Sequence, residues 1–330
     1  MKPVQPIAAA VVLVFCAACS PDREAAAPVP AGDPDPPAET PEEVISLTGQ
    51  ALPQPALPDE FRATQEEHLA TARERLDAAP DEPENWIWVG RRAAYLGRYA
   101  EAIGVYTEAI ERFPDEPRLY RHRGHRYLTT RRLDAAIDDL AHAARLVTGK
   151  PDQVEPDGLP NALGIPTSTL QSNVWYHLGL AHYLKGDFEP ALAAYRKCLE
   201  VSKNPDMLTA TSYWLYLTLR RLGEDEEAAA VLAAITPELK IIENHDYHRL
   251  LLSYRELTDA DELYQEATAE PATVRFSTIL YGLGAYHLVE GRPDRARTFF
   301  ERARESPAWA AFGFLAAEAE LARDEAGYTG

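Results

Sequence analysis

A 34-residue period constrains the fold of this chain more than any other feature of its sequence. The tetrapeptide Pro-Asp-Glu-Pro occurs at residues 80–83 and again at residues 114–117. Between the two copies, apolar and small residues recur at helical spacing in two stripes, one on each side of Gly97. The unit therefore predicts two antiparallel helices. Small residues such as Gly90 and Ala102 allow the two helices to approach closely.

The unit at residues 83–116 resembles the tetratricopeptide repeat, which places large, small and proline residues at set positions of a 34-residue unit. Trp86, Gly90, Tyr106 and Pro114 occupy such positions. The resemblance implies an all-α, right-handed solenoid of helical hairpins. In such a solenoid each repeat buries its apolar side against its neighbours, and there is no single central core.

The same register continues along the chain and predicts one helical domain over residues 59–330. We expect an unpaired helix that caps the start, about five hairpins, an insertion, a degenerate hairpin and a closing helix. The expected ranges are 59–79 for the first cap, 83–116, 117–149, 172–205, 209–236 and 277–308 for the hairpins, 150–171 for the insertion, 237–270 for the degenerate hairpin and 308–323 for the closing helix.

The N-terminus predicts export and a lipid anchor. After Lys2, an apolar run over residues 7–18 is too short to span a bilayer and is typical of a signal peptide, which we place at residues 1–18. The run ends in Phe-Cys-Ala-Ala-Cys-Ser, which resembles a bacterial lipobox with lipid on Cys19. Residue 16 is a cysteine where such motifs usually carry leucine. The sequence therefore predicts a membrane contact through the N-terminal lipid.

Residues 19–58 predict a disordered tether between this anchor and the helical domain. Ten prolines fall between residues 20 and 58, and most of the others are aspartate, glutamate or alanine. Such a composition favours extended conformations. Ser20 follows the lipidation site where an aspartate would retain a lipoprotein in the inner membrane. We therefore expect the protein in a bacterial cell envelope, at the outer membrane and facing the periplasm.

Charge and cysteine content exclude two classes of protein. The chain has 33 basic and 52 acidic residues, a net charge of −19, which argues against binding to nucleic acid. Outside the first twenty residues the chain has one cysteine, Cys198, so the helical domain cannot contain a disulfide framework. Cys198 stands where other repeats carry alanine, and this position indicates a buried structural role.

Inward-facing positions of the repeats predict a groove for a protein or peptide ligand. Six arginines and no acidic residue lie in residues 118–133, and tyrosines recur at the equivalent position of later repeats. Guanidinium groups can pair with carboxylates, so the ligand is expected to be an extended, acidic peptide. The candidate groove residues are Arg91, Arg118, Arg121, His125, Tyr176, Tyr183, Tyr213, Arg220 and Tyr281.

These arginines have a second interpretation. They could pair only with acidic neighbours in the sequence and balance local charge, which would leave no binding site. The neighbours are Glu116, Asp134, Asp138 and Asp139.

The insertion at residues 150–171 is rich in proline and glycine and interrupts the helical register. Long loops in compact domains often have a function. Its polar side chains could bind a cation or cover one end of the groove, and a plain surface loop is the third interpretation. These side chains are Asp152, Glu155, Asp157 and Asn161.

The sequence contains no motif that indicates catalysis or metal binding. Histidine pairs occur at residues 122 and 125 and at residues 245 and 248, but neither pair has a third ligand nearby in a known motif. There is no glycine-flanked serine nucleophile and no phosphate-binding loop. We therefore expect no catalytic residues, no metal and no cofactor. The alternative is an envelope hydrolase whose site combines residues 150–171 with groove histidines and aspartates.

Residues 211–323 also resemble tetratricopeptide lipoproteins of the NlpI type. In those proteins an aromatic helix, like residues 213–217 here, precedes an irregular hairpin and a last repeat. They are periplasmic adaptors that recruit a processing protease and murein hydrolases. The resemblance implies a non-enzymatic scaffold in the cell envelope. Because the insertion at residues 150–171 departs from that pattern, the identity of the partner does not carry over.

Overall fold

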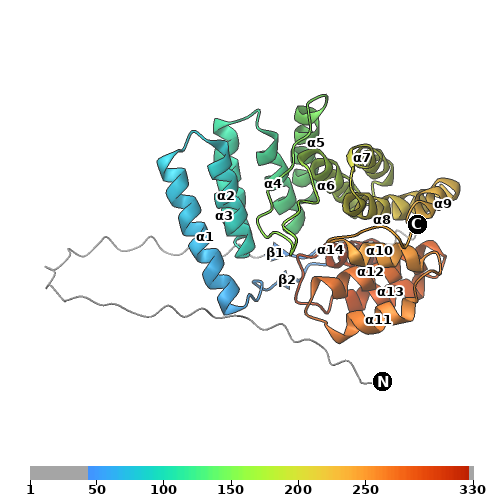
Figure 1. Ribbon diagram of the computed structural model, residues 1–330. Coiled ribbons are helices and arrows are strands. Elements are labelled where there is room, and N and C mark those ends of the chain that lie inside the picture. Colours follow the sequence, from blue (N-terminus) through green and yellow to red (C-terminus); the bar gives the residue numbers. More distant parts are fainter. Residues whose placement is uncertain (1–43, 327–330) are drawn as a thin grey trace, which may run out of the picture. The chain divides into compact units, whose positions relative to one another are not determined.

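A computed structural model describes residues 44–326, and most of them are helical (Figure 1). The all-α fold of helical hairpins, which the repeat register predicts, is confirmed. The short strands β1 (Val44–Ile45) and β2 (Ala51–Leu52) form a small antiparallel ladder ahead of the helices. Within residues 44–326, no helix combines the length and the apolar character needed to cross a membrane.

The helices follow one another in antiparallel pairs. Helix α1 (Asp59–Ala78) stands before the first pair, and α14 (Phe312–Glu325) follows the last. The pairs are α2 (Pro83–Tyr95) with α3 (Tyr99–Arg112), α4 (Pro117–Thr129) with α5 (Leu133–Val147), α6 (Leu170–Lys185) with α7 (Phe188–Val201), α8 (Pro205–Leu222) with α9 (Asp225–Ala233), α10 (His245–Ser253) with α11 (Ala260–Ala269), and α12 (Val274–Val289) with α13 (Pro293–Ala303).

In the pairs α2–α3 and α6–α7, close approach between the two helices depends on a glycine in the first helix. A Cβ atom on Gly90 of α2 would lie 2.4 Å from the ring of Tyr106 on α3. The same arrangement recurs in α6 and α7, where a Cβ on Gly179 would lie 2.7 Å from the ring of Tyr195. Both tyrosines are buried, so the large ring fills the space that the glycine leaves.

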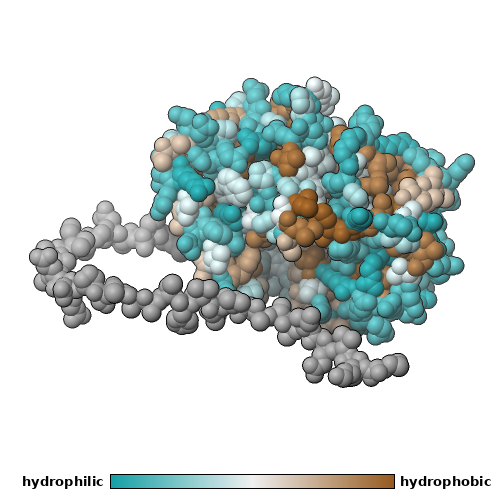
Figure 2. Space-filling view, in the orientation of Figure 1, coloured by the Kyte–Doolittle hydropathy of each residue, from teal (hydrophilic) through white to brown (hydrophobic). Residues whose placement is uncertain are grey.

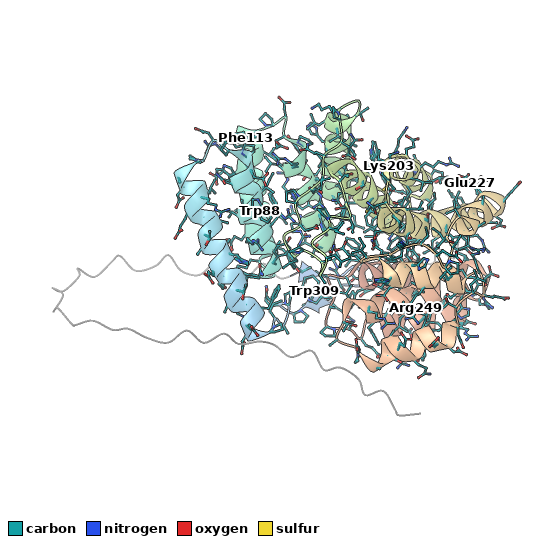
Figure 3. All side chains as sticks on the ribbon, viewed as in Figure 1. Trp88, Phe113, Lys203, Glu227, Arg249 and Trp309 are labelled. Atoms are coloured by element: carbon teal, nitrogen blue, oxygen red, sulfur yellow. The ribbon has the colours of Figure 1, made fainter. Side chains whose placement is uncertain are left out.

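The surface that Figure 2 draws is mostly hydrophilic, with hydrophobic residues near its middle and toward its right side. The apolar residues inside form an N-terminal cluster around α1–α4 and a larger one that extends to α14. Trp309, after α13, belongs to the N-terminal cluster and packs edge-on against Tyr99, with 5.6 Å between ring centroids. In Figure 3 it lies between the N-terminal and C-terminal helices. Trp309, between α13 and α14, thus completes the apolar core of the first repeat.

Helix α14 packs into the interior of the helical array. It contacts α6, α12 and α13, and nine consecutive residues from Gly313 to Leu321 are buried. The charged members of this run are paired. Glu318 accepts a hydrogen bond of 2.8 Å from Arg131, and Glu320 accepts two of 2.9 Å from Arg221. A helix at the C-terminus therefore fills the inner side of repeats that lie much earlier in the sequence.

The predicted tether over residues 19–58 is corrected at its C-terminal end, because residues 44–58 are ordered against the helices. The backbone N–H of Leu47 donates to the Glu318 carboxylate, and the indole N–H of Trp309 donates to the Pro53 carbonyl over 2.7 Å. The Pro55 ring packs on Gly97, close enough that a Cβ there would meet it at 2.9 Å. The predicted signal peptide, Cys19 and the rest of the tether lie outside the described residues.

Candidate functional site

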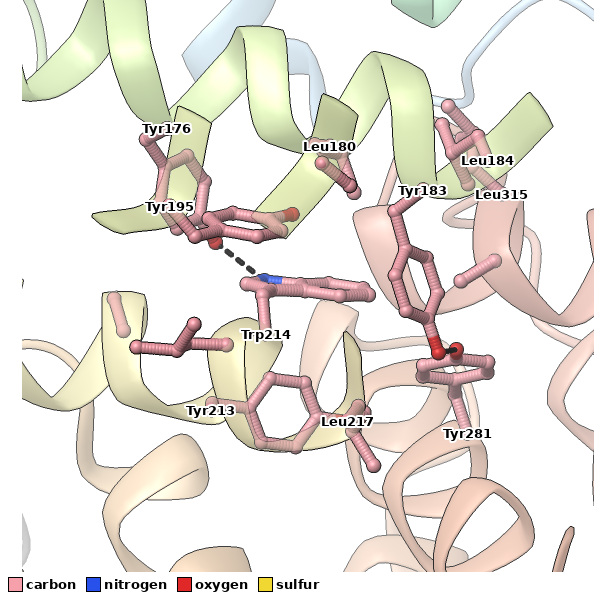
Figure 4. Packing of buried hydrophobic residues seen from close by; sticks show 14 of the residues in the cluster. Tyr176, Leu180, Tyr183, Leu184, Tyr195, Tyr213, Trp214, Leu217, Tyr281 and Leu315 are labelled. Carbon is pink, nitrogen blue, oxygen red and sulfur yellow. Dashed lines mark hydrogen bonds between the residues drawn. The ribbon is translucent and has the colours of Figure 1, made fainter. Parts of the chain in front are cut away.

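The four tyrosines of the predicted groove are buried. Tyr176, Tyr183, Tyr213 and Tyr281 are 6%, 1%, 0% and 1% exposed. They gather around Trp214, whose indole N–H donates to the Tyr176 hydroxyl over 2.7 Å (Figure 4). Burial raises the pKa of Tyr183 to about 12. The expectation that these rings offer an exposed ladder is corrected, because later helices and α14 fill the space in front of them.

Two of the predicted groove arginines have partners within the fold. Arg118 pairs with Glu116 at 2.8 Å, and Arg220 pairs with Asp225 and Glu290, each at 2.8 Å. The pairing of Arg118 follows the second interpretation, in which arginines balance neighbouring acids. Both side chains are held in place by these contacts, and Arg118 also lines the small cavity beneath the loop that is described below.

Arg91 and Arg121 lie in a different environment, beneath the loop between α5 and α6, residues 148–169. Segment 153–158 of this loop crosses the inner side of α2 and α4. Nη1 of Arg91 donates to the Pro156 carbonyl over 2.7 Å, and Nη1 of Arg92 donates to the Gly158 carbonyl over 3.1 Å. Of the interpretations left open for the insertion, the contacts are those of a segment that covers one end of the groove.

Glu155 is the centre of this arrangement and is 6% exposed. One carboxylate oxygen lies 3.1 Å from Nε of Arg121, the other lies 3.5 Å from Nε2 of His122, and the Asn173 amide of α6 donates to the carboxylate. Arg121 also donates to Nδ1 of His122 over 2.9 Å, and since arginine has no acceptor, the proton of His122 is on Nε2. These partners compensate the cost of burying a carboxylate.

Three histidines surround this site and are neutral at neutral pH. Burial, with Arg121 and Arg126 nearby, lowers the pKa of His177 to about 3. The same causes lower the pKa values of His122 and His125 well below the usual range. The rings of His125 and His177 are 4.4 Å apart between centroids. The positive charge that faces Glu155 therefore comes from arginine, and it does not depend on pH near neutrality.

A small cavity of about 20 Å³ remains between the loop and the helices. It is lined by Arg91 and His122 on the helices and by residues 153–156 of the loop. A volume of this size corresponds to about one water molecule. Within residues 44–326, His, Cys, Asp and Glu side chains form no group of three that could hold a metal ion. The loop segment thus fills the inner side of α2 and α4 almost completely.

The outer side of the loop is apolar. Among the described residues, four of the seven exposed large hydrophobic side chains belong to it, with exposed fractions of 49–66%. The hydrophobic residues near the middle of Figure 2 lie over the region where Figure 1 draws this loop. The four are Val154, Leu159, Leu163 and Ile165.

Family models identify the repeats of this array. Models of the tetratricopeptide repeat match residues 90–151, 172–205 and 249–309. The chain contains tetratricopeptide repeats. The last match begins inside α10, so the pair predicted as degenerate contributes to a recognised repeat.

Solved structures of other tetratricopeptide repeat proteins are similar to the chain at low identity. YrrB, described as a TPR protein with an unusual peptide-binding site, is 15% identical, with a TM-score of 0.41 over 76% of this chain and 97% of its own. A tetratricopeptide repeat protein from Parabacteroides merdae is 13% identical, with a TM-score of 0.44 over 79% and 98%. These likenesses concern the fold alone. No curated protein sequence matches the chain.

Sequence reasoning named Arg91, Arg121 and Glu155 but missed three residues of the site, the first of which, Arg92 of α2, donates to the Gly158 carbonyl. Asn173 lies in the first turn of α6, where an asparagine in a tetratricopeptide repeat suggests helix capping, and only the fold brings it to Glu155. Gly158 lies among prolines and suggests an ordinary turn. In the structure it packs against Tyr95 of α2, and a Cβ there would lie 2.2 Å from the Tyr95 hydroxyl.

Proposed function

We propose that this chain is a non-enzymatic, protein-binding scaffold of a bacterial cell envelope, anchored by lipid on Cys19. Its binding face is the inner side of α2 and α4. The observation that carries the proposal is the way in which this face holds segment 153–158. Arg91 and Arg92 bind two main-chain carbonyls, and Arg121 pairs with a carboxylate. A face with these donors can hold an extended peptide from another protein in the same way.

An envelope hydrolase, with a site built from the loop and groove histidines, has less support. The cavity between the loop and the helices has about 20 Å³, whereas sites for small molecules usually have about 300–1,000 Å³. His122 contacts Arg121 and Glu155, and His177 is hydrogen-bonded to the Asn173 carbonyl over 2.6 Å. His122 is thus occupied by its contacts to Arg121 and the loop, and His177 by a hydrogen bond within α6, which favours a binding role for the same surface.

Recovery of partners from the envelope of the producing organism tests the scaffold role. The full chain is compared with the double variant Arg91→Gln, Arg92→Gln and with the control Arg196→Gln, which removes an exposed ion pair to Glu227 on α7 and α9. We expect the double variant to lose its partners because both main-chain contacts are removed, and the control to keep them. Equal recovery with both variants, at equal helix content by circular dichroism, would contradict the proposed binding face.

Lipid anchoring rests on the lipobox-like residues 16–20, and fractionation of cells tests it. Replacing Cys19 by alanine removes the thiol that would carry the lipid, so we expect the protein to move from the membrane fraction to the soluble fraction. The control Cys16→Leu introduces the residue that lipoboxes usually carry at this position, and this variant should stay in the membrane fraction. A Cys19→Ala protein that remains in the membrane fraction would exclude the anchor.

A further inference from the structure

We infer that segment 153–158 is a resident occupant of the binding face, and that the external ligand is an extended peptide with an acidic residue followed three positions later by glycine. This inference rests on the proposed function and adds to it the ligand's sequence and a competition with the chain's own loop. Glu155 and Gly158 supply this pattern, because the helices restrict which type of residue each of these two positions can hold.

The first position requires a carboxylate. The site beneath the loop contains Arg121, with Arg91 and Arg126 nearby, in a chain whose net charge is −19. His122 and the Asn173 amide complete the shell around the Glu155 carboxylate. A neutral side chain in this place would leave the buried Arg121 without its counter-charge, which costs more than the loss of an exposed ion pair. Binding therefore selects an acidic residue.

The second position requires the smallest residue. A Cβ at position 158 would lie 2.2 Å from the Tyr95 hydroxyl and 2.9 Å from the Cζ of its ring. Tyr95 is not free to turn away without cost, because its hydroxyl accepts a hydrogen bond of 3.2 Å from Arg91, which also binds the Pro156 carbonyl. Any side chain at this position would therefore disturb the contacts that hold the peptide main chain.

The segment can leave the face without unfolding the helices that flank it. The loop spans residues 148–169, between the end of α5 and the start of α6. Outside the face, segment 153–158 is held by few contacts, among them the hydrogen bond of 2.9 Å from the Leu170 N–H to the Gln153 carbonyl. A tethered occupant has a high effective concentration, so an external peptide must compete with it, and its apparent affinity is reduced accordingly.

A fluorescent synthetic peptide with the sequence of residues 151–161 provides the probe. It is titrated against the full chain, against a variant whose residues 151–168 are replaced by a glycine-serine linker of equal length, and against Gly158→Val, which keeps the loop but prevents its docking. We expect the peptide to bind both variants at least about tenfold more tightly than the natural chain, because the face is free only in the variants. Circular dichroism verifies that each variant is folded.

Peptide variants give the specificity. Changing Glu155→Gln in the peptide should weaken binding about tenfold or more, the usual effect of losing a charged hydrogen-bonding group. Changing Gly158→Val in the peptide should abolish binding, whereas Asp157→Asn, at a position without a role in the inference, should leave it within about twofold. The inference is overturned if folded variants do not bind the peptide, if the natural chain binds it as well as they do, or if Glu155→Gln binds equally.

The outcome separates this inference from the proposed function. If the peptide binds as expected while envelope partners are recovered independently of Arg91 and Arg92, the ligand pattern stands and the scaffold role of this face does not. If the recovery of partners depends on the two arginines but the folded loop variants do not bind the peptide, the face binds proteins by other contacts. The inferred ligand pattern is then wrong.

Discussion

Replacing Glu318 by alanine is expected to lower the free energy of unfolding by about 3–5 kcal/mol, because Arg131 would stay charged and lose its counter-charge in the interior. The Arg131 and Glu318 side chains are 3% and 0% exposed. Arg131 donates to the carboxylate over 2.8 Å and to the Trp309 carbonyl over 3.0 Å. The substitution also removes the acceptor of the Leu47 backbone N–H. One change therefore affects α14, the α4–α5 turn and the N-terminal strands together.

Thermal and urea denaturation followed by circular dichroism measure this effect. For a domain of this size, about 2–4 °C of melting temperature corresponds to 1 kcal/mol, so Glu318→Ala should melt about 6–20 °C lower. The control Glu108→Ala changes an exposed residue of α3 and should stay within about 0.5 kcal/mol. Replacing both Arg131 and Glu318 by methionine should recover much of the loss, since no buried charge remains. A Glu318→Ala protein as stable as the control would contradict this account.

Substituting alanine for Gly313 is expected to displace α14 from α12. A Cβ at this position would lie 2.5 Å from the Ser277 carbonyl oxygen and 2.7 Å from the Thr278 Cα. Both are backbone atoms, so no rotamer change relieves the overlap, and the helices must separate. Overpacking of this kind costs about 1–3 kcal/mol and occasionally more. We expect the upper part of that range, because the rest of α14 is buried over nine consecutive residues.

The matched control for Gly313→Ala is Gly104→Ala in α3. A Cβ on Gly104 would meet nothing within 4 Å, and alanine is the better helix former, so the control should be stabilised by up to about 1 kcal/mol. Urea denaturation measures both changes. Near-ultraviolet circular dichroism reports whether the tyrosines around Trp214 lose their fixed packing. Equal stability of Gly313→Ala and the natural chain would show that α14 does not need this close approach.

The repeat register predicted the helical hairpins but not what fills their inner side. Periodicity depends on residues a few positions apart, whereas Tyr213 is buried against Tyr247 of α10, and Tyr281 is buried against Tyr183 of α6, 98 residues earlier. The register assigned those tyrosines to the inner side of their helices. It contained no information about whether that side meets solvent, a ligand or another part of the chain. Glu155 was named as a polar side chain of the insertion, where the register is interrupted, so the register could not place it beside Arg121.

One signal in the sequence could have found the buried ion pair. Gly97, Gly186, Gly223 and Gly291 stand at the turn inside their hairpins with φ values of 75°, 85°, 76° and 71°. In the second repeat the corresponding residue, 34 positions after Gly97, is Arg131, with a φ of 62°. A residue with a Cβ is strained in this conformation, so its presence at a glycine position indicates a compensating interaction. That interaction is the one with Glu318.

The position of α14 affects how this protein folds during its synthesis. Synthesis proceeds from the N-terminus, so α6 and α12 are made before α14, the later helix that packs against both of them. The repeats therefore cannot mature one by one as they leave the ribosome. Until α14 docks, the nascent chain exposes the apolar surface on which aggregation and chaperone binding depend. A stop codon only a few codons before residue 312 would leave that surface open for the whole lifetime of the chain.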